Sequence, residues 1–233
     1  DSVASRGLGD VYKRQLLEAK LEEVLSSGRI SAIIYSSPNN PAWFNLTEDE
    51  LRTIGELATK YDVIVIEDLA YMCMDFRKPL GKPFEAPFQP TVAKYTDNYI
   101  IMMSASKMFS YAGQRIAILA VSDRLYNREY PGLQNRYRIA RLGDALVLGV
   151  LYAVSSGTSH SAQYALAAMF KAACDGELDF VAATSEYARR AALTKKMFVD
   201  NGFHIVYALD GDEPVSDCLL YTSPSPRDAT LSR

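Results

Sequence analysis

Four short apolar runs of strand-like composition constrain most strongly how this chain can fold. The runs are Ile30 to Ser36, Val63 to Glu67, Tyr99 to Met103 and Ile116 to Val121. Leu16 to Ser26 has the spacing of an amphipathic helix that ends at Gly28, and Thr47-Glu48-Asp49-Glu50 is a capping box that opens a helix to about Lys60. Because strands that alternate with helices form covered parallel sheets, we predict an α/β fold with a mostly parallel sheet covered by helices.

The second half of the chain has helical character. Helical spacing extends over Leu133 to Val154, Ser159 to Ala173 and Glu177 to Asn201, with Ser159 as the expected N-cap and Gly202 as the expected C-cap. Phe203 to Tyr207 then has the composition of a strand. In the first half, Phe76 to Pro90 is rich in proline and phenylalanine, and we expect a long loop that serves as a lid or a binding segment.

Composition and charge exclude several classes of protein. The 233 residues are 48% hydrophobic and 23% charged with a net charge of −3, which is typical of a globular protein with a sizeable core and not of a nucleic-acid-binding one. No apolar run is long enough to span a membrane, and the first residues lack a signal-peptide pattern. Cys73, Cys174 and Cys218 are odd in number and lack C-x-x-C spacing, so we expect no disulfide, no metal and a cytoplasmic location.

Polar side chains follow three successive strands of the predicted sheet. Asn40 lies in the turn Ser37-Pro38-Asn39-Asn40-Pro41 after the first strand, and Asp68-Leu69-Ala70-Tyr71 follows the second. The third strand leads into Ser104-Ala105-Ser106-Lys107, with Arg115 a short distance later. Since open α/β sheets bind their ligands at the carboxyl ends of strands, these groups are expected to share one site.

The segment around Lys107 has the residue types that a phosphate site needs. The hydroxyls of Ser104 and Ser106 can donate to phosphate oxygens, and Arg115 can hold a phosphate through two charge-assisted hydrogen bonds. The amine of Lys107 is then free for chemistry. Alone, a Ser-x-Ser-Lys segment is more often a surface loop, so the interpretation depends on the other two clusters.

The ordered set resembles the pyridoxal-phosphate (PLP) aminotransferases of class I/II, which have fold type I, and the resemblance covers about residues 15 to 216. It implies a homodimer that binds PLP, an amino acid and a 2-oxo acid. It also implies a role for each member of the set: Lys107 for the Schiff base, Asp68 for the pyridine nitrogen, Asn40 and Tyr71 for the ring hydroxyl, and Ser104, Ser106 and Arg115 for the phosphate.

Chemistry gives these roles a reason, although each residue has an ordinary structural alternative. A carboxylate such as Asp68 keeps a pyridine nitrogen protonated, so that the ring can accept electrons, and Lys107 can move a proton at the substrate α-carbon. Taken singly, Asp68 could cap a short helix begun at Leu69, Tyr71 could belong to the core, and Asn40 could be a turn residue. Together, in this order, they favour the cofactor site.

The chain also departs from the family pattern. Many members have Thr-Gly after the Asn-Pro pair, whereas here Ala42 and Trp43 follow, which indicates a different loop or pocket wall. The glycine-rich phosphate turn and the ring-stacking aromatic expected upstream are absent, as is the carboxylate-binding arginine expected after about residue 217. We therefore expect a fragment that binds PLP poorly and turns over little by itself.

The resemblance also divides the chain. Residues 15–175 are expected to form part of the PLP-binding large domain, and residues 176–216 the connecting helix and the start of a small C-terminal α/β domain. Residues 1–14 and 217–233 lack periodicity and resemble translated sequencing adapter, so we expect them to be non-native; genuine flexible tails are the alternative.

Several functions remain open at this point. An aminotransferase is the first hypothesis, and the same residues also suit PLP-dependent C–S β-lyases, decarboxylases and α-oxoamine synthases. An aminotransferase-like PLP-binding domain of a transcription regulator, or an α/β binding domain without PLP, are further alternatives. The expected dimer contacts are Tyr126, Tyr130, Arg136 and Arg138.

Overall fold

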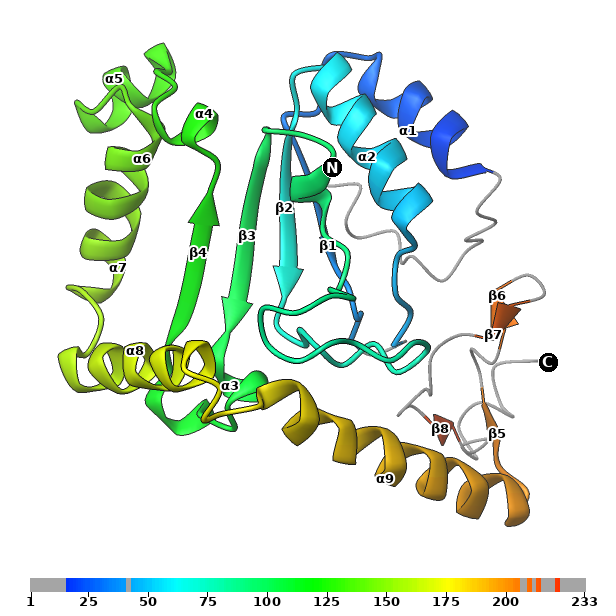
Figure 1. Ribbon diagram of the computed structural model, residues 1–233. Coiled ribbons are helices and arrows are strands. Elements are labelled where there is room, and N and C mark those ends of the chain that lie inside the picture. Colours follow the sequence, from blue (N-terminus) through cyan, green and yellow to red (C-terminus); the bar gives the residue numbers. More distant parts are fainter. Residues whose placement is uncertain (1–15, 41–42, 206–208, 211–212, 215–220, 223–233) are drawn as a thin grey trace, which may run out of the picture.

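A four-stranded sheet in the order β1-β2-β3-β4 forms the centre of the molecule (Figure 1). The computed structural model describes residues 16–40, 43–205, 209–210, 213–214 and 221–222. The strands are β1 (Ala32–Ser36), β2 (Ile64–Leu69), β3 (Tyr99–Ser104) and β4 (Ala117–Val121). The first three are parallel, which confirms the mostly parallel α/β prediction. The last strand, β4, pairs with β3 in the antiparallel direction.

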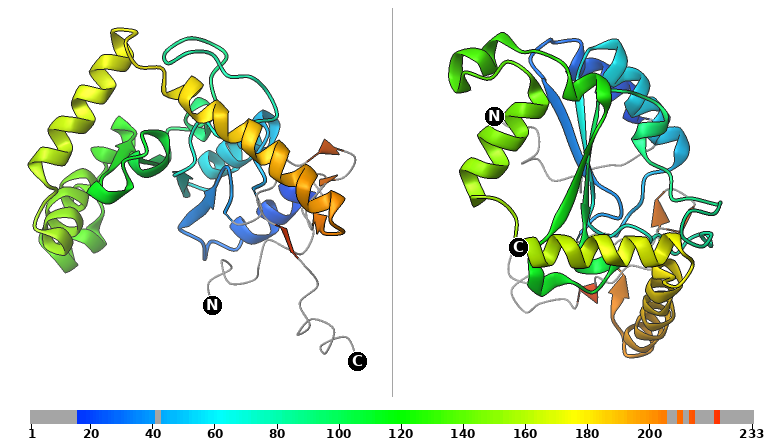
Figure 2. Two further views of the ribbon diagram at one scale, coloured as in Figure 1. Left: turned by 90° about the horizontal axis from the view of Figure 1, so that it is seen from below. Right: turned by 60° about the vertical axis from the view of Figure 1, so that its left-hand side comes forward.

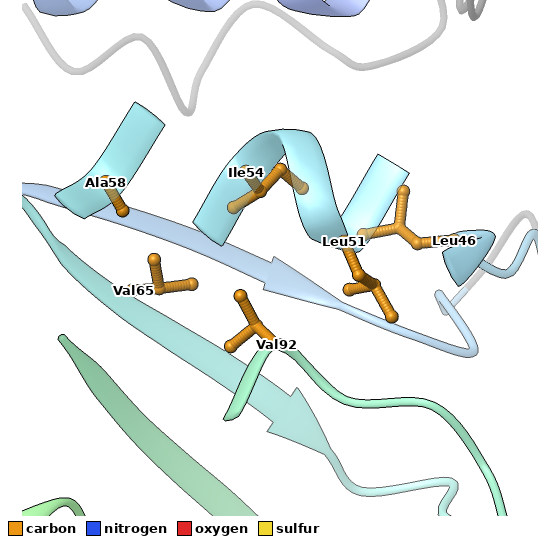
Figure 3. Packing of buried hydrophobic residues seen from close by; sticks show 6 residues of the cluster. All are labelled: Leu46, Leu51, Ile54, Ala58, Val65 and Val92. Carbon is orange, nitrogen blue, oxygen red and sulfur yellow. The ribbon is translucent and has the colours of Figure 1, made fainter. Parts of the chain in front are cut away.

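Two helices, α1 (Leu17–Leu25) and α2 (Glu48–Lys60), cover one face of the sheet (Figure 1). The predicted capping box is confirmed: the side chain of Thr47 accepts from the backbone N–H of Glu50, and the Glu50 carboxylate accepts from the Thr47 N–H at 2.7 Å. The apolar side of α2 packs on β2 and on the short 3-10 helix η3 (Val92–Lys94). Figure 3 shows this core, which consists of Leu46, Leu51, Ile54, Ala58, Val65 and Val92.

The segment after β4 differs from the continuous helix predicted over Leu133 to Val154. It comprises α4 (Asp123–Tyr126), α5 (Pro131–Tyr137), α6 (Leu142–Asp144), the π-helix η5 (Ala145–Tyr152) and α7 (Ala153–Ser155). The helix is interrupted because Arg138 adopts a left-handed conformation with φ 62°. The chain then turns back, so that the Tyr130 N–H donates to the Ala140 carbonyl and Glu129 pairs with Arg141 in a β-bridge.

Two longer helices complete the described α-helical part. The helix α8 (His160–Cys174) has Ser159 at its N-cap position, as predicted. The helix α9 (Phe180–Asp200) begins later than the predicted Glu177, because the Asp179 carboxylate accepts from the Ala182 N–H and caps it. Figures 1 and 2 show α9 running from α8 past the carboxyl-end edge of the sheet toward β5.

Short strands follow α9. They are β5 (His204–Ile205), β6 (Leu209–Asp210), β7 (Glu213–Pro214) and β8 (Tyr221–Thr222), which form the pairs β5-β8 and β6-β7. The rest of the strand predicted at Phe203 to Tyr207 lies outside the described residues, as do residues 1–14. So does the predicted tail 217–233, except for β8. Across the described ranges, the structure contains no helix whose length and apolar character would let it cross a membrane.

Candidate active site

The candidate site lies where β1, β2 and β3 end. Ser36 of β1 is in register with Asp68 of β2, and Asp68 with Met102 of β3. Because side chains alternate along a strand, Asp68 and Ser104, two residues beyond Met102, share one face of the sheet. The parallel order thus brings the three predicted polar clusters to one edge.

Three of the predicted residues meet beyond this edge. The side-chain amide of Asn40 donates to the phenolic oxygen of Tyr71 at 3.1 Å. The Lys107 amine lies 5.7 Å from the centre of the Tyr71 ring, within the range of a cation–π contact. Each comes from the segment after a different strand, so the contact depends on the tertiary fold.

Asp68 occupies the carboxyl end of β2 and is half-buried. Its Oδ1 accepts from the backbone N–H of Ala70 at 2.8 Å, which starts the turn that carries Tyr71. The alternative that Asp68 caps a helix begun at Leu69 is wrong, because a turn and not a helix follows β2. The carboxylate therefore fixes the direction in which the chain leaves the sheet.

The Ser104 to Lys107 segment forms the strand-to-helix turn between β3 and α3 (Ala105–Met108). The Ser104 hydroxyl accepts from the Ser106 N–H at 3.2 Å and is the N-cap. Ala105 and Met108 are buried, and this leaves Ser106 half-buried and Lys107 exposed. Burial of the two apolar neighbours is therefore what presents the lysine amine to the site.

Arg115 follows the 3-10 helix η4 (Ala112–Gln114) in a left-handed conformation with φ 51°. The Ala105 N–H donates to the carbonyl of Ile116, so Arg115 lies beside the start of α3. Its guanidinium is exposed and donates to the Ala112 carbonyl at 3.0 Å. The fold thus brings Arg115 to the expected end of the sheet, where its guanidinium is hydrogen-bonded to the turn that carries it.

Trp43, which stands where the family pattern led us to expect a glycine, packs against the ring of Tyr71. It is 5% exposed, and its ring makes an edge contact with Tyr71 at 4.9 Å and stacks on Phe76 at 6.5 Å. The neighbouring Pro41 and Ala42 lie outside the described residues. The buried Trp43 ring therefore packs against Tyr71 and restricts where the tyrosine ring can lie.

Sequence reasoning missed two polar side chains near the site, the buried Glu67 and the half-buried Gln89. Glu67 is completely buried on the α1/α2 face, where Tyr35 Oη and the Val92 N–H donate to its carboxylate, each at 3.1 Å. Burial raises the pKa of Glu67 to about 7, against these hydrogen bonds, which lower it. The sequence signal that could have identified Glu67 was an acidic residue within an apolar run.

Gln89 bridges two turns of the site, and no pattern in the sequence marked it out.

The four residues expected at a dimer interface lie in and around α4 and α5. Within this chain, the Arg141 guanidinium stacks 5.8 Å from the ring centre of Tyr126, and that of Arg128 lies 4.8 Å from the ring centre of Tyr130. Both tyrosines thus have intramolecular partners at the end of the sheet opposite to Lys107 (Figure 1).

Known proteins share both sequence and fold with this chain. Residues 12–206 match the family model of class I and II aminotransferases. A "Probable aspartate aminotransferase" of Methanocaldococcus jannaschii is 28% identical over 120 residues, which are 52% of this chain and 29% of that protein. The chain therefore spans less than a third of that relative.

Two solved structures show the same fold. A double mutant of Thermus thermophilus aspartate aminotransferase matches with a TM-score of 0.56 and 19% identity, over 79% of this chain and 42% of that one. A PLP-bound C–S lyase from Staphylococcus hominis matches with a TM-score of 0.50 and 19% identity, over 81% of this chain and 42% of that one. Since the family model covers most of its length, the chain belongs to the class I and II aminotransferase family and has part of the fold type I architecture.

Proposed function

We propose that the complete protein containing this chain is a PLP-dependent aminotransferase that moves an amino group between an amino acid and a 2-oxo acid. The observation that carries the proposal is the meeting of Asn40, Tyr71 and Lys107 at one edge of the sheet. Membership of the aminotransferase family supports it.

The side chains at this edge fit PLP in their chemistry. When bound, PLP supplies an electron-accepting pyridine ring beside an aldehyde that condenses with amines. Lys107 is the amine that would hold the aldehyde carbon, as a Schiff base, and would then carry a proton to and from the substrate α-carbon. Asp68 would keep the proton on the pyridine nitrogen, because a carboxylate stabilises the cationic form.

The Asn40–Tyr71 pair is arranged to donate to a ligand oxygen. Because the Asn40 amide donates to the Tyr71 oxygen, the phenolic hydrogen of Tyr71 is free to point toward the ring hydroxyl of the cofactor. Successive hydrogen bonds polarise each other, so the amide strengthens the donation by the phenol. Tyr71 would thereby stabilise negative charge on the ring oxygen of bound PLP.

Three further residues would hold the phosphate. The Ser104 oxygen accepts from the Ser106 N–H, so its hydrogen remains available to a phosphate oxygen, as does the hydroxyl of Ser106. The exposed guanidinium of Arg115 would add charge-assisted hydrogen bonds and would exchange or share its contact with the Ala112 carbonyl.

A PLP-dependent C–S lyase is the second candidate, because a lyase with the same fold is known. A fold hosts several chemistries, and the bond broken depends on how the substrate is held. A product assay on the complete, PLP-loaded protein separates the two. An aminotransferase yields a 2-oxo acid with transfer of nitrogen, whereas a lyase acting on a cysteine conjugate yields pyruvate and ammonia.

The organisation of the complete protein is part of the proposal. Residues 15–175 would belong to the large domain, and residues 176–216 would connect it to the small domain. We also propose a homodimer in the cytoplasm. Gel filtration with light scattering tests the dimer, and a monomer that retains transaminase activity would contradict it.

Borohydride trapping tests the proposed chemistry. The complete protein loaded with PLP is reduced, digested and analysed by mass spectrometry, and we expect the pyridoxyl label on Lys107. Lys107→Arg should abolish the label, while the matched control Lys171→Arg, an exposed lysine paired with Asp175 on α8, should retain it. Asp68→Asn should keep the label, because Lys107 is unchanged. It should slow turnover, because the pyridine nitrogen loses the carboxylate that keeps it protonated and the ring accepts electrons less well. A label on another residue, or none, would refute the proposal.

A further inference from the structure

Gln89 links the two turns that carry Asn40 and Tyr71. It lies near the end of the Phe76 to Pro90 loop and is half-buried. Its side-chain oxygen accepts from the Cys73 N–H at 2.6 Å, and its side-chain nitrogen donates to the Ser37 carbonyl at 3.3 Å. One planar amide therefore spans the turn after β1 and the turn after β2.

Each end of this link is anchored by a second hydrogen bond. The Ser37 hydroxyl accepts from the Leu46 N–H at 3.0 Å, and Ser37 is 6% exposed. The Thr184 hydroxyl of α9 shares its hydrogen between the Val181 carbonyl at 2.9 Å and the Cys73 carbonyl at 3.2 Å, and Cys73 is 7% exposed. Gln89 thus connects two points that are themselves held by α9 and by the segment before α2, and not two freely moving loops.

The planar geometry of the Gln89 amide fixes how far apart the two turns lie. Its oxygen and nitrogen are bonded to the same planar carbon, so the two hydrogen bonds together fix the separation of the Cys73 nitrogen and the Ser37 oxygen. Tyr71 is two residues before Cys73, and Asn40 is three residues after Ser37. Their mutual hydrogen bond is exposed, and an exposed contact holds two turns together only weakly.

We propose that Gln89 is a positioning residue for the Asn40–Tyr71 pair, and that it thereby sets how strongly this pair donates to the oxygen of a bound ligand. The inference rests on the proposed function, in which that ligand is PLP. Both side-chain hydrogen bonds of Gln89 join it to backbone atoms of the two turns, so it acts through Asn40 and Tyr71.

Two variants separate the two bonds of Gln89. Gln89→Met has a similar length and removes both hydrogen bonds. Gln89→Glu keeps an acceptor for the Cys73 N–H, removes the donor to Ser37, and turns a carboxylate oxygen toward the Ser37 carbonyl. The matched control is Gln134→Met, since Gln134 is exposed on α5 at the far end of the sheet.

The first measurement is amide hydrogen exchange at Cys73 in the complete protein without PLP. Loss of the acceptor in Gln89→Met should speed exchange roughly tenfold, because the part-buried hydrogen bond of the Cys73 N–H is lost. Gln89→Glu and Gln134→Met should leave the Cys73 rate unchanged. This readout depends only on the contact and not on the cofactor.

The second measurement is the pH titration of the absorbance band of bound PLP. If Tyr71 donates more weakly to the ring oxygen of PLP, that oxygen carries more negative charge. The Lys107 nitrogen bound beside it then holds its proton more strongly. Both Gln89 variants should therefore raise the titration midpoint by roughly half a pH unit, about threefold in proton affinity, while Gln134→Met should not. A purely structural role would leave this midpoint unchanged.

Each outcome supports or overturns the inference. If the exchange rate of the Cys73 amide is unchanged in Gln89→Met, the Cys73–Gln89 hydrogen bond is refuted. If the pH midpoint of the PLP band is unchanged in both Gln89 variants, the positioning role of Gln89 is refuted. If Gln89→Met fails to fold, Gln89→Glu still tests the midpoint, because it retains the Cys73 contact. If the wild-type protein shows no PLP band, the proposed function fails and this inference falls with it, which is distinguishable from variants that leave an existing band unmoved.

Discussion

Replacement of Glu67 by glutamine should change how the stability of this protein depends on pH. The Glu67 side chain is completely buried between β1, β2 and η3, and burial raises its pKa from the ordinary 4.5 to about 7. The folded protein therefore binds a proton at Glu67 more readily than the unfolded chain does. The contribution to stability is fully present below the unfolded pKa and is lost as the pH rises through about 7.

The size of this effect follows from the two pKa values of Glu67. The difference between 4.5 and about 7 corresponds to ~3 kcal/mol of unfolding free energy. A glutamine cannot ionise, but it presents only one accepting oxygen to the two donors, Tyr35 Oη and the Val92 N–H, which should cost about 1 kcal/mol at every pH. Glu67→Gln should thus match wild type in stability near pH 5, where ionisation of Glu67 already costs about 1 kcal/mol, and should be more stable by ~2 kcal/mol near pH 8.

Urea unfolding of the protein without cofactor, followed by circular dichroism at several pH values, measures this divergence. The difference between variant and wild type isolates Glu67, because every other titrating group is common to both proteins. Two stability curves that run parallel between about pH 5 and pH 8 would show that the buried carboxylate does not titrate in this range, and would refute the reasoning.

Three further substitutions test the packing around α2 by the same unfolding assay. Leu51→Ala should lower the unfolding free energy by ~3 kcal/mol, because Leu51 is 1% exposed in the main core; a loss below about 1 kcal/mol would contradict that packing. Thr47→Ala should cost about 1 kcal/mol through loss of the capping box with Glu50, and an unchanged midpoint would argue against the cap. Gly55→Ala should destabilise the protein although alanine favours helices, because its methyl group would lie 2.7 Å from the Cβ of Tyr95; a raised melting temperature would contradict this.

Much of the fold and of the candidate site could be predicted from local sequence signals. The capping box at Thr47 joins residues three apart, and the apolar runs that become strands need only their own composition. The candidate residues Asn40, Asp68 and Lys107 were found because each follows such a run, and parallel strands bring their carboxyl ends to one edge. The roles of these residues toward PLP stay predictions.

Local signals failed where distant segments decide the conformation. The helix predicted from Leu133 ends early because Arg138 turns left-handed and the chain pairs back on itself through Tyr130 and Ala140. Helical spacing describes which side chains could share a face, but it carries no information about a returning backbone partner.

The sequence by itself determined the order of strands and helices, the turn and cap residues, and the identity of the polar groups at the strand ends, because these depend on neighbours along the chain. Only the tertiary structure decided that Glu67 is buried against Val92 and that Gln89 joins Ser37 to Cys73. The physical reason is that a side-chain hydrogen bond to a distant backbone group requires only a suitable distance and direction, and these exist once the intervening chain has folded.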